Sequence, residues 1–141
     1  MTEQRRRRAY DDSLIRDIKG FNAIGVLHTP SGRPLREAVD YLASKRIGLT
    51  MVTNADGALA GVISERDVIR ALYEHGNDAL NMPVDMFMVR DVITCSETDR
   101  AVDVAKIMAE RHIRHLPIVD DGYLSGMVSA TDLVKHYASK A

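Results

Sequence analysis

A serine and an aspartate three residues apart occur twice in this chain, each time after a glycine and two apolar residues. The two copies are Gly61–Asp67 (GVISERD) and Gly126–Asp132 (GMVSATD), 65 residues apart. Each copy then continues into an apolar helical pattern, so each predicts a strand that ends at a helix N-terminus. Such a junction presents free N–H groups and a partial positive charge, which suits a phosphate.

A purely structural interpretation of the motif exists. Ser-x-x-Asp is close to a capping box, in which the serine oxygen accepts a helix N–H and the carboxylate accepts from the cap residue. One copy alone indicates only the start of a helix. Two copies with the same strand and glycine before them favour a repeated functional unit.

The elements around each motif follow the same order: strand, helix, strand, strand, helix. In the first copy they are predicted as strand 24–29, a helix that begins near Pro34, strand 47–53, a turn at 54–57, strand 59–63 and helix 64–74. In the second they are strand 92–95, helix 100–111, strand 115–119, a turn at 120–122, strand 124–128 and helix 131–139. The chain is therefore an internal duplication.

The predicted organisation has four parts. Residues 1–23 form a basic tail that contains Arg5–Arg8 and a short amphipathic helix, residues 24–76 the first repeat, residues 77–89 a connector, and residues 90–141 the second repeat. A solvated tail is the simpler interpretation of the arginine run, and an arm that touches acidic partners or nucleic acid is the alternative.

Composition narrows the class of protein. The chain has 141 residues, a net charge of −1 and 45% hydrophobic residues, as expected of a soluble globular protein. No apolar run is long enough to span a bilayer, and the N-terminus lacks the apolar core of a secretory signal. A single cysteine, Cys95, suits a reducing compartment, so we expect a cytoplasmic protein with no membrane contact. The near-neutral charge and few aromatics make nucleic acid an improbable partner.

These repeats resemble a tandem pair of CBS domains, also called a Bateman module, of the small stand-alone bacterial type. The resemblance lies in the duplicated Gly-h-h-Ser-x-x-Asp motif, in the strands at 47–52 and 113–120, and in Ser64–Asp67, and it covers about residues 24–139. It implies an α+β fold, in which two β-α-β-β-α repeats pack with pseudo-two-fold symmetry. It also implies a regulatory module without catalysis, and a homodimer formed through the helices.

The resemblance further implies an adenosine ligand in clefts between the repeats: AMP first, then ATP, ADP or NAD(H), with no metal required. It assigns the ribose hydroxyls to Asp67 and Asp132, and the phosphate to Ser64, Ser129 and Thr131. Arg66 is a further candidate for the phosphate because of its charge. The residues assigned to the base and phosphate ends are Ile47, Gly48, Leu49, Ile113, Arg114 and His115, and Thr94 and His28 complete the set.

The two clefts are expected to differ. Gly48 and Leu49 stand where the second repeat has Arg114 and His115, so we expect the Asp132 cleft, with that polar pair beside it, to bind more tightly.

Other classes of function remain open at this point. The chain contains none of the common nucleotide-binding or hydrolase motifs that would indicate an enzyme. His112, His115 and Cys95 could suggest zinc, but no second closely spaced ligand pair supports them. A ligand-free dimerisation module that regulates a separate, unidentified protein is the main alternative.

Overall fold

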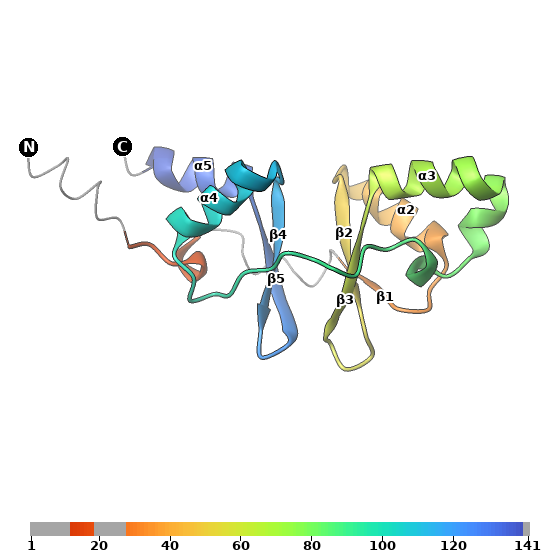
Figure 1. The fold of residues 1–141 in the computed structure, drawn as a ribbon, viewed down its shortest axis with the longest axis horizontal. Coiled ribbons are helices and arrows are strands. Elements are labelled where there is room, and N and C mark those ends of the chain that lie inside the picture. Colours follow the sequence, from red (N-terminus) through yellow and green to blue (C-terminus); the bar gives the residue numbers. More distant parts are fainter. Residues whose placement is uncertain (1–11, 19–27, 140–141) are drawn as a thin grey trace, which may run out of the picture.

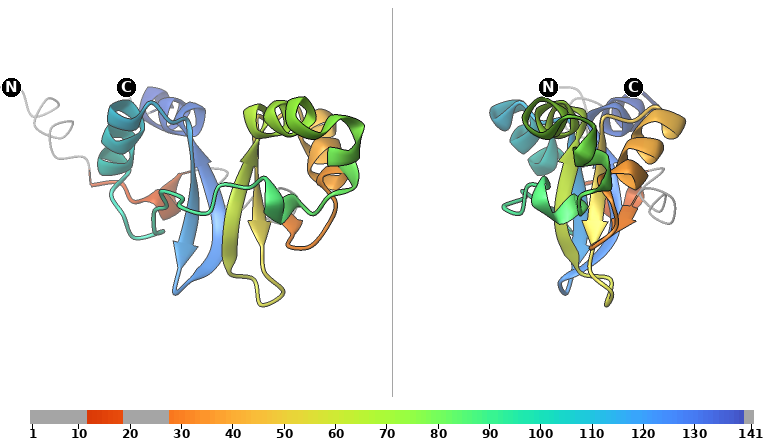
Figure 2. Two further views of the ribbon diagram at one scale, coloured as in Figure 1. Left: turned by 45° about the vertical axis from the view of Figure 1, so that its right-hand side comes forward. Right: turned by 90° about the vertical axis from the view of Figure 1, so that its right-hand side faces the viewer.

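The computed structural model describes residues 12–18 and 28–139. The molecule has two similar halves whose sheets lie next to each other at the centre, with two helices on the outer side of each sheet (Figure 1). The two further views show the same pairing of sheet and helices in each half (Figure 2). Among the described residues, no helix is both long and apolar enough to cross a membrane.

The first half contains a three-stranded sheet in the order β1-β2-β3. Strand β1 (His28–Pro30) is parallel to β2 (Leu49–Thr53), which is antiparallel to β3 (Leu59–Ser64). Helix α2 (Leu35–Lys45) connects β1 to β2, and helix α3 (Glu65–His75) follows β3. The predicted order of elements is confirmed here, although residues 24–27 of the predicted first strand lie outside the described residues.

The second half repeats this plan with a shorter sheet. Strand β4 (His115–Asp120) is antiparallel to β5 (Tyr123–Ser129), and helices α4 (Ala101–Arg111) and α5 (Ala130–Ser139) pack beside them. The strand predicted at 92–95 is wrong in length, because only Cys95 forms a bridge, parallel to Ile118 of β4. The α+β class and the tandem repeat are confirmed.

Each half has its own hydrophobic core, and the cores match position by position. Helix α2 buries Leu35, Ala38 and Leu42 at helical spacing, and α4 buries Ala101, Val104 and Met108, each 66 residues later. The buried aliphatic side chains of β2 and β3, and of β4 and β5, complete the two clusters. The duplicated apolar pattern therefore explains the duplicated packing.

The segment before the first repeat belongs to the core of the second. The amide of Ile15, in the 3-10 helix η1 (Ile15–Asp17), donates to the Asp99 carbonyl at 2.9 Å, and Ala101 donates to the Ser13 carbonyl at 2.8 Å. Ile15 and Ile18 are buried in the cluster that contains α4 and α5. Part of the segment predicted as a basic tail with a short helix over residues 1–23 thus packs against the second repeat, while Arg5–Arg8 lie outside the described residues.

The connector between the repeats packs against the first core, just as the N-terminal segment packs against the second. It contains the 3-10 helices η3 (Gly76–Asn81) and η4 (Val84–Met86), and the Val84 amide donates to the Arg33 carbonyl at 2.8 Å. Val84 is fully buried in the first core together with Met88. The segment predicted as a connector over 77–89 thus also contributes apolar residues to the core of the first repeat.

The glycine that opens the first motif lets the connector pass close to β3. Val62 and Val89 exchange two backbone hydrogen bonds of 2.9 and 2.8 Å, which holds the connector against the strand. A Cβ atom on Gly61 would lie 2.6 Å from the Val89 carbonyl oxygen and 2.9 Å from the Met88 sulfur. A side chain at this position would therefore push the connector away.

Gly61→Ala is expected to lower the free energy of unfolding by about 1–3 kcal/mol, since overpacking against backbone forces a local shift. Urea denaturation monitored by circular dichroism measures the change. Gly48→Ala is the matched control, because a Cβ on Gly48 meets no atom within 4 Å. Equal stability of Gly61→Ala and wild type would contradict the close approach.

Candidate functional site

The first motif forms a complete capping box at the start of α3. The Asp67 amide donates to Ser64 Oγ at 3.2 Å, and Asp67 Oδ2 accepts from both the Ser64 amide and the Ser64 hydroxyl at 2.8 Å. The structural interpretation of the motif is therefore confirmed. It does not use the whole carboxylate, because within residues 12–18 and 28–139 no hydrogen bond reaches Asp67 Oδ1. That oxygen remains an available acceptor.

The second motif has the same geometry at α5. The Ser129 amide donates to Asp132 Oδ2 at 2.9 Å, and the Asp132 amide donates to Ser129 Oγ at 3.0 Å. In both halves the residue before the central strand accepts from the first helical amide, since Glu65 donates to Gly48 at 3.0 Å and Ala130 to Arg114 at 2.8 Å. The backbones of the two junctions are therefore equivalent.

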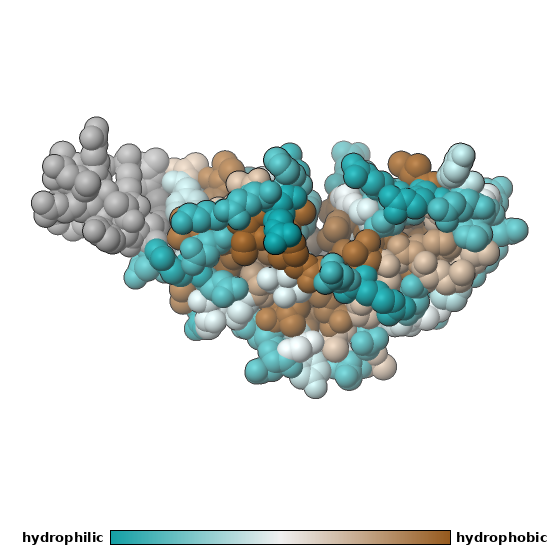
Figure 3. All heavy atoms as spheres, in the orientation of Figure 1, coloured by the Kyte–Doolittle hydropathy of each residue, from teal (hydrophilic) through white to brown (hydrophobic). Residues whose placement is uncertain are grey.

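A cleft of about 410 Å³ lies between the two halves, which is within the size range of small-molecule sites. Its walls come from β2, β3 and α3 on one side, from β4 on the other, and from the chain that crosses between them. The lining residues are Leu49, Val62, Ser64, Arg66, Asp67, Arg70, Val89, Asp91, Val92, Ile93, Ile113, His115 and Pro117. Apolar surface lies between the halves on the face seen in Figure 3.

Most charged side chains of the cleft lie on α3, and one lies on the crossing chain. Arg66 and Arg70 are exposed on the first turns of α3, and Asp67 between them is buried. Asp91 is exposed on the wall formed by the crossing chain. No ion pair joins these four side chains to any described residue. The arginines are therefore available to a ligand.

His115 faces the cleft from the second repeat. Burial lowers the pKa of its imidazole, the neighbouring Arg114 lowers it further, and Asp132 opposes these effects. The ring is therefore mainly neutral near pH 7 and offers one donor and one acceptor nitrogen. These are groups suited to hydrogen bonding with a heterocycle rather than to neutralising an anion.

The structure changes the expected pairing of the clefts. Ile113 and His115, which were expected to support Asp132, line the cleft that contains Asp67. Arg114 is not part of that cleft, because successive side chains of a strand point to opposite faces. It lies instead beside a groove between α4 and α5. The first motif, which was expected to lack polar support, therefore gains His115 from the other repeat.

The remaining predicted site residues lie outside this cleft. Asp132 lines a separate hollow of about 430 Å³ with Asp17, Lys135, His136 and Ser139. Ile47 packs against the first core. His28 Nδ1 lies 3.0 Å from Thr53 Oγ1. The chain places Thr94 and Thr131 at exposed positions.

Sequence reasoning missed several cleft residues. Arg70 was detectable, since it stands one helical turn after Arg66 and at the position of Lys135 in the second repeat. Asp91, Val92 and Ile93 had no such signal, because their place in the cleft depends on the path of the crossing chain.

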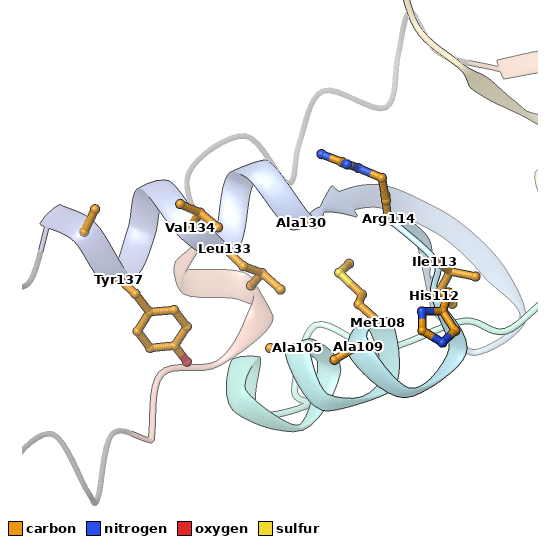
Figure 4. Close-up of a pocket in the computed structure, with 11 residues that line it drawn as sticks. Ala105, Met108, Ala109, His112, Ile113, Arg114, Ala130, Leu133, Val134 and Tyr137 are labelled. Carbon is orange, nitrogen blue, oxygen red and sulfur yellow. The ribbon is translucent and has the colours of Figure 1, made fainter.

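A second, larger depression runs between α4 and α5 and is mostly apolar. Its volume is about 890 Å³, and most of its residues come from the facing sides of the two helices (Figure 4). Val134 on this face is 68% exposed, and Ile69, which stands at the equivalent position of α3, is 67% exposed. Both halves therefore present an uncovered apolar helix face.

The zinc interpretation gains no support from the described residues. No three histidine, cysteine or acidic side chains among them lie close enough together to hold a metal ion. Burial raises the pKa of the Cys95 thiol to about 12, with further contributions from Asp99 and Asp120. A thiol with so high a pKa is a poor metal ligand, because the thiolate is the coordinating form.

The family model of the CBS domain matches residues 21–74 and 84–139. The chain therefore belongs to the CBS-domain family and carries two tandem copies of the domain. CBS-domain pairs are generally regulatory modules.

Among its relatives is the uncharacterized protein MJ1225 of Methanocaldococcus jannaschii, which is 33% identical over 121 residues. The alignment covers 86% of this chain but only 41% of MJ1225. Two solved structures cover nearly the whole of both chains. The CBS-domain protein ATU1752 of Agrobacterium tumefaciens is 29% identical with a TM-score of 0.74, covering 89% of this chain and 94% of that one. The CBS-domain pair of MJ0100, solved with 5′-methylthioadenosine and S-adenosyl-L-methionine, is 25% identical with a TM-score of 0.75, covering 92% and 98%.

Proposed function

We propose that this chain is a regulatory module that binds an adenosine nucleotide in the cleft between its two repeats and performs no catalysis of its own. The observation that carries the proposal is the Oδ1 atom of Asp67, which accepts no hydrogen bond from any described residue and lies in a cleft of suitable size beside the N-terminus of α3. A carboxylate oxygen of this kind can accept ribose hydroxyls. The N-terminus of α3 and Arg66 can receive a phosphate.

The apolar part of the cleft suits the base. Val62, Ile93 and Ile113 offer flat contact to a heterocycle, and the neutral His115 ring can hydrogen-bond to its edge. The adenosine ligands of the MJ0100 domain pair support the same class of ligand here.

An adenosine nucleotide is expected to raise the melting temperature by several degrees. A ligand at 100 times its dissociation constant adds about 2.7 kcal/mol to the free energy of unfolding, because it binds only the folded state. Differential scanning fluorimetry with AMP, ADP, ATP, NAD(H) and S-adenosylmethionine at millimolar concentration measures the shift. Guanosine nucleotides at the same concentration are the control, since they carry the same phosphates on another base. An unchanged melting temperature with every adenosine compound would contradict the proposal.

A homodimer is the second part of the proposal, and it would also serve a ligand-free interaction module. On an ordinary surface the exposed apolar residues are scattered singly. Here they line a groove between α4 and α5 and also lie on the equivalent face of α3. A second copy of the chain would cover both faces at once, because the helices of the two halves lie at the same end of the molecule, opposite the turns of the β-hairpins (Figure 2). The target that such a module regulates would be a separate protein.

A further inference from the structure

The cleft between the repeats contains two arginines that form no ion pair with any described residue. Arg66 and Arg70 are four residues apart on α3, so their side chains leave the helix on the same face. Like charges at this spacing destabilise a helix by a few tenths of a kcal/mol. Neither forms an ion pair within the part of the chain that the structure describes. A ligand anion is therefore the partner that both could share.

Asp67 fixes where that anion would lie. Arg70 follows Asp67 by three residues, and positions three apart lie on one side of a helix. A ribose held by Asp67 would thus place its 5′ substituent along the first two turns of α3, between the two guanidinium groups. The acidic side chain of Asp91 lies on the wall formed by the crossing chain, which disfavours an anion there. The negative part of the ligand is expected on the α3 side.

We infer that the ligand of this cleft carries at least two consecutive phosphates at its 5′ position, one for Arg66 and one for Arg70. The inference rests on the proposed function and narrows its ligand from adenosine compounds in general to those with a diphosphate. Successive phosphates can meet arginines that are one 5.4 Å turn apart, whereas a single phosphate leaves one guanidinium unpaired or crowds both onto one group. A ligand with a sulfonium group, such as S-adenosylmethionine, is expected to bind weakly, because its positive charge would lie beside those of Arg66 and Arg70.

The pair of arginines occurs in only one of the two repeats. The residues of the second repeat that correspond to Arg66 and Arg70 are Thr131 and Lys135, so that repeat has only one of the two cations. The hollow at Asp132 also contains the carboxylate of Asp17. A diphosphate ligand is therefore expected to prefer the Asp67 cleft.

Isothermal titration calorimetry on the full chain with adenosine, AMP, ADP, ATP and S-adenosylmethionine tests the inference. ADP is expected to bind about tenfold or more tightly than AMP, because one more charge-assisted contact forms. The advantage of ADP should shrink at high salt, since the arginines are exposed. If AMP or S-adenosylmethionine binds as tightly as ADP, the inference is wrong while the proposed function stands. If no adenosine compound binds, both are wrong.

Substitutions at Arg70 test whether this residue causes the preference for ADP over AMP. Arg70→Gln is expected to remove most of the tenfold advantage of ADP over AMP and to leave adenosine affinity unchanged. Arg70→Lys should recover part of the advantage, because it restores the charge without the forked geometry. Arg36→Gln, at an exposed position of α2 outside the cleft, is the control for the loss of one positive charge. An equal loss of ADP affinity in Arg36→Gln and Arg70→Gln, or a matching loss of adenosine affinity in Arg70→Gln, would overturn the assignment.

Discussion

Asp67→Ala is expected to weaken nucleotide binding in the cleft between the repeats by at least 100-fold. The change removes the Oδ1 acceptor, which no described residue occupies, and hydrogen bonds to a charged group contribute about 1.5–3 kcal/mol each. A ribose offers two hydroxyls to one carboxylate, so both contacts would be lost together. Calorimetric titration with the nucleotide that gives the largest thermal shift measures the change.

Asp132→Ala is the matched control for this experiment. Both substitutions remove the acidic half of a capping box, so each is expected to cost about 0.5–2 kcal/mol of stability. Only Asp67 lines the cleft that also contains His115. Binding that survives Asp67→Ala and disappears in Asp132→Ala would restore the ranking expected from the sequence and would refute the cleft proposed here.

Val134→Arg is expected to convert a dimer into a monomer. The wild-type chain should scatter light as twice its 15.7 kDa mass, because an apolar groove of about 890 Å³ is uncovered in one copy. A charged side chain at a 68% exposed position would not disturb the core of its own chain, but it would have to be buried unpaired in the dimer. Ile69→Arg, at the equivalent position of α3, should have the same effect if both halves take part.

Met86→Arg separates the loss of an interface from a general effect of added charge. Met86 is 59% exposed on η4, away from the outer faces of α3 and α5. This variant should remain a dimer by size-exclusion chromatography with light scattering. A wild-type chain that is monomeric at all accessible concentrations would contradict the proposed assembly.

The order of the elements was predictable from the sequence because local signals repeat. Each Ser-x-x-Asp marks a helix start, and the capping boxes at Ser64 and Ser129 confirm that interpretation. The apolar residues that α2 and α4 bury recur at helical spacing, so the sequence contains the signal for these faces. Helix and strand ends differ from the predictions by one or two residues, except for the strand at 92–95 and for the start of the strand at 24–29, which lies outside the described residues.

The exchange of segments between the repeats was not predictable in the same way. Ile15 and Ile18 are apolar at helical spacing, and this pattern shows that they are buried but not in which core. The carbonyl that accepts from the Ile15 amide belongs to Asp99, more than 80 residues further along the chain. The same limit applies to the site. The residue types of Asp67 and His115 indicated ligand contacts, but only the packing of the halves brings the two residues into one cleft.

The reciprocal exchange of segments has a consequence for how the protein unfolds. Neither half is a self-sufficient folding unit, because the first core contains Val84 and Met88 while the second contains Ile15 and Ile18. When one core opens, the segment that packs into it loses its apolar contacts. Because each such segment continues directly into the other half, the loss of one core destabilises the other. The two repeats are therefore expected to melt in a single cooperative transition. A ligand that occupies only one cleft would then stabilise the whole chain, which is how one binding event could reach surfaces far from it.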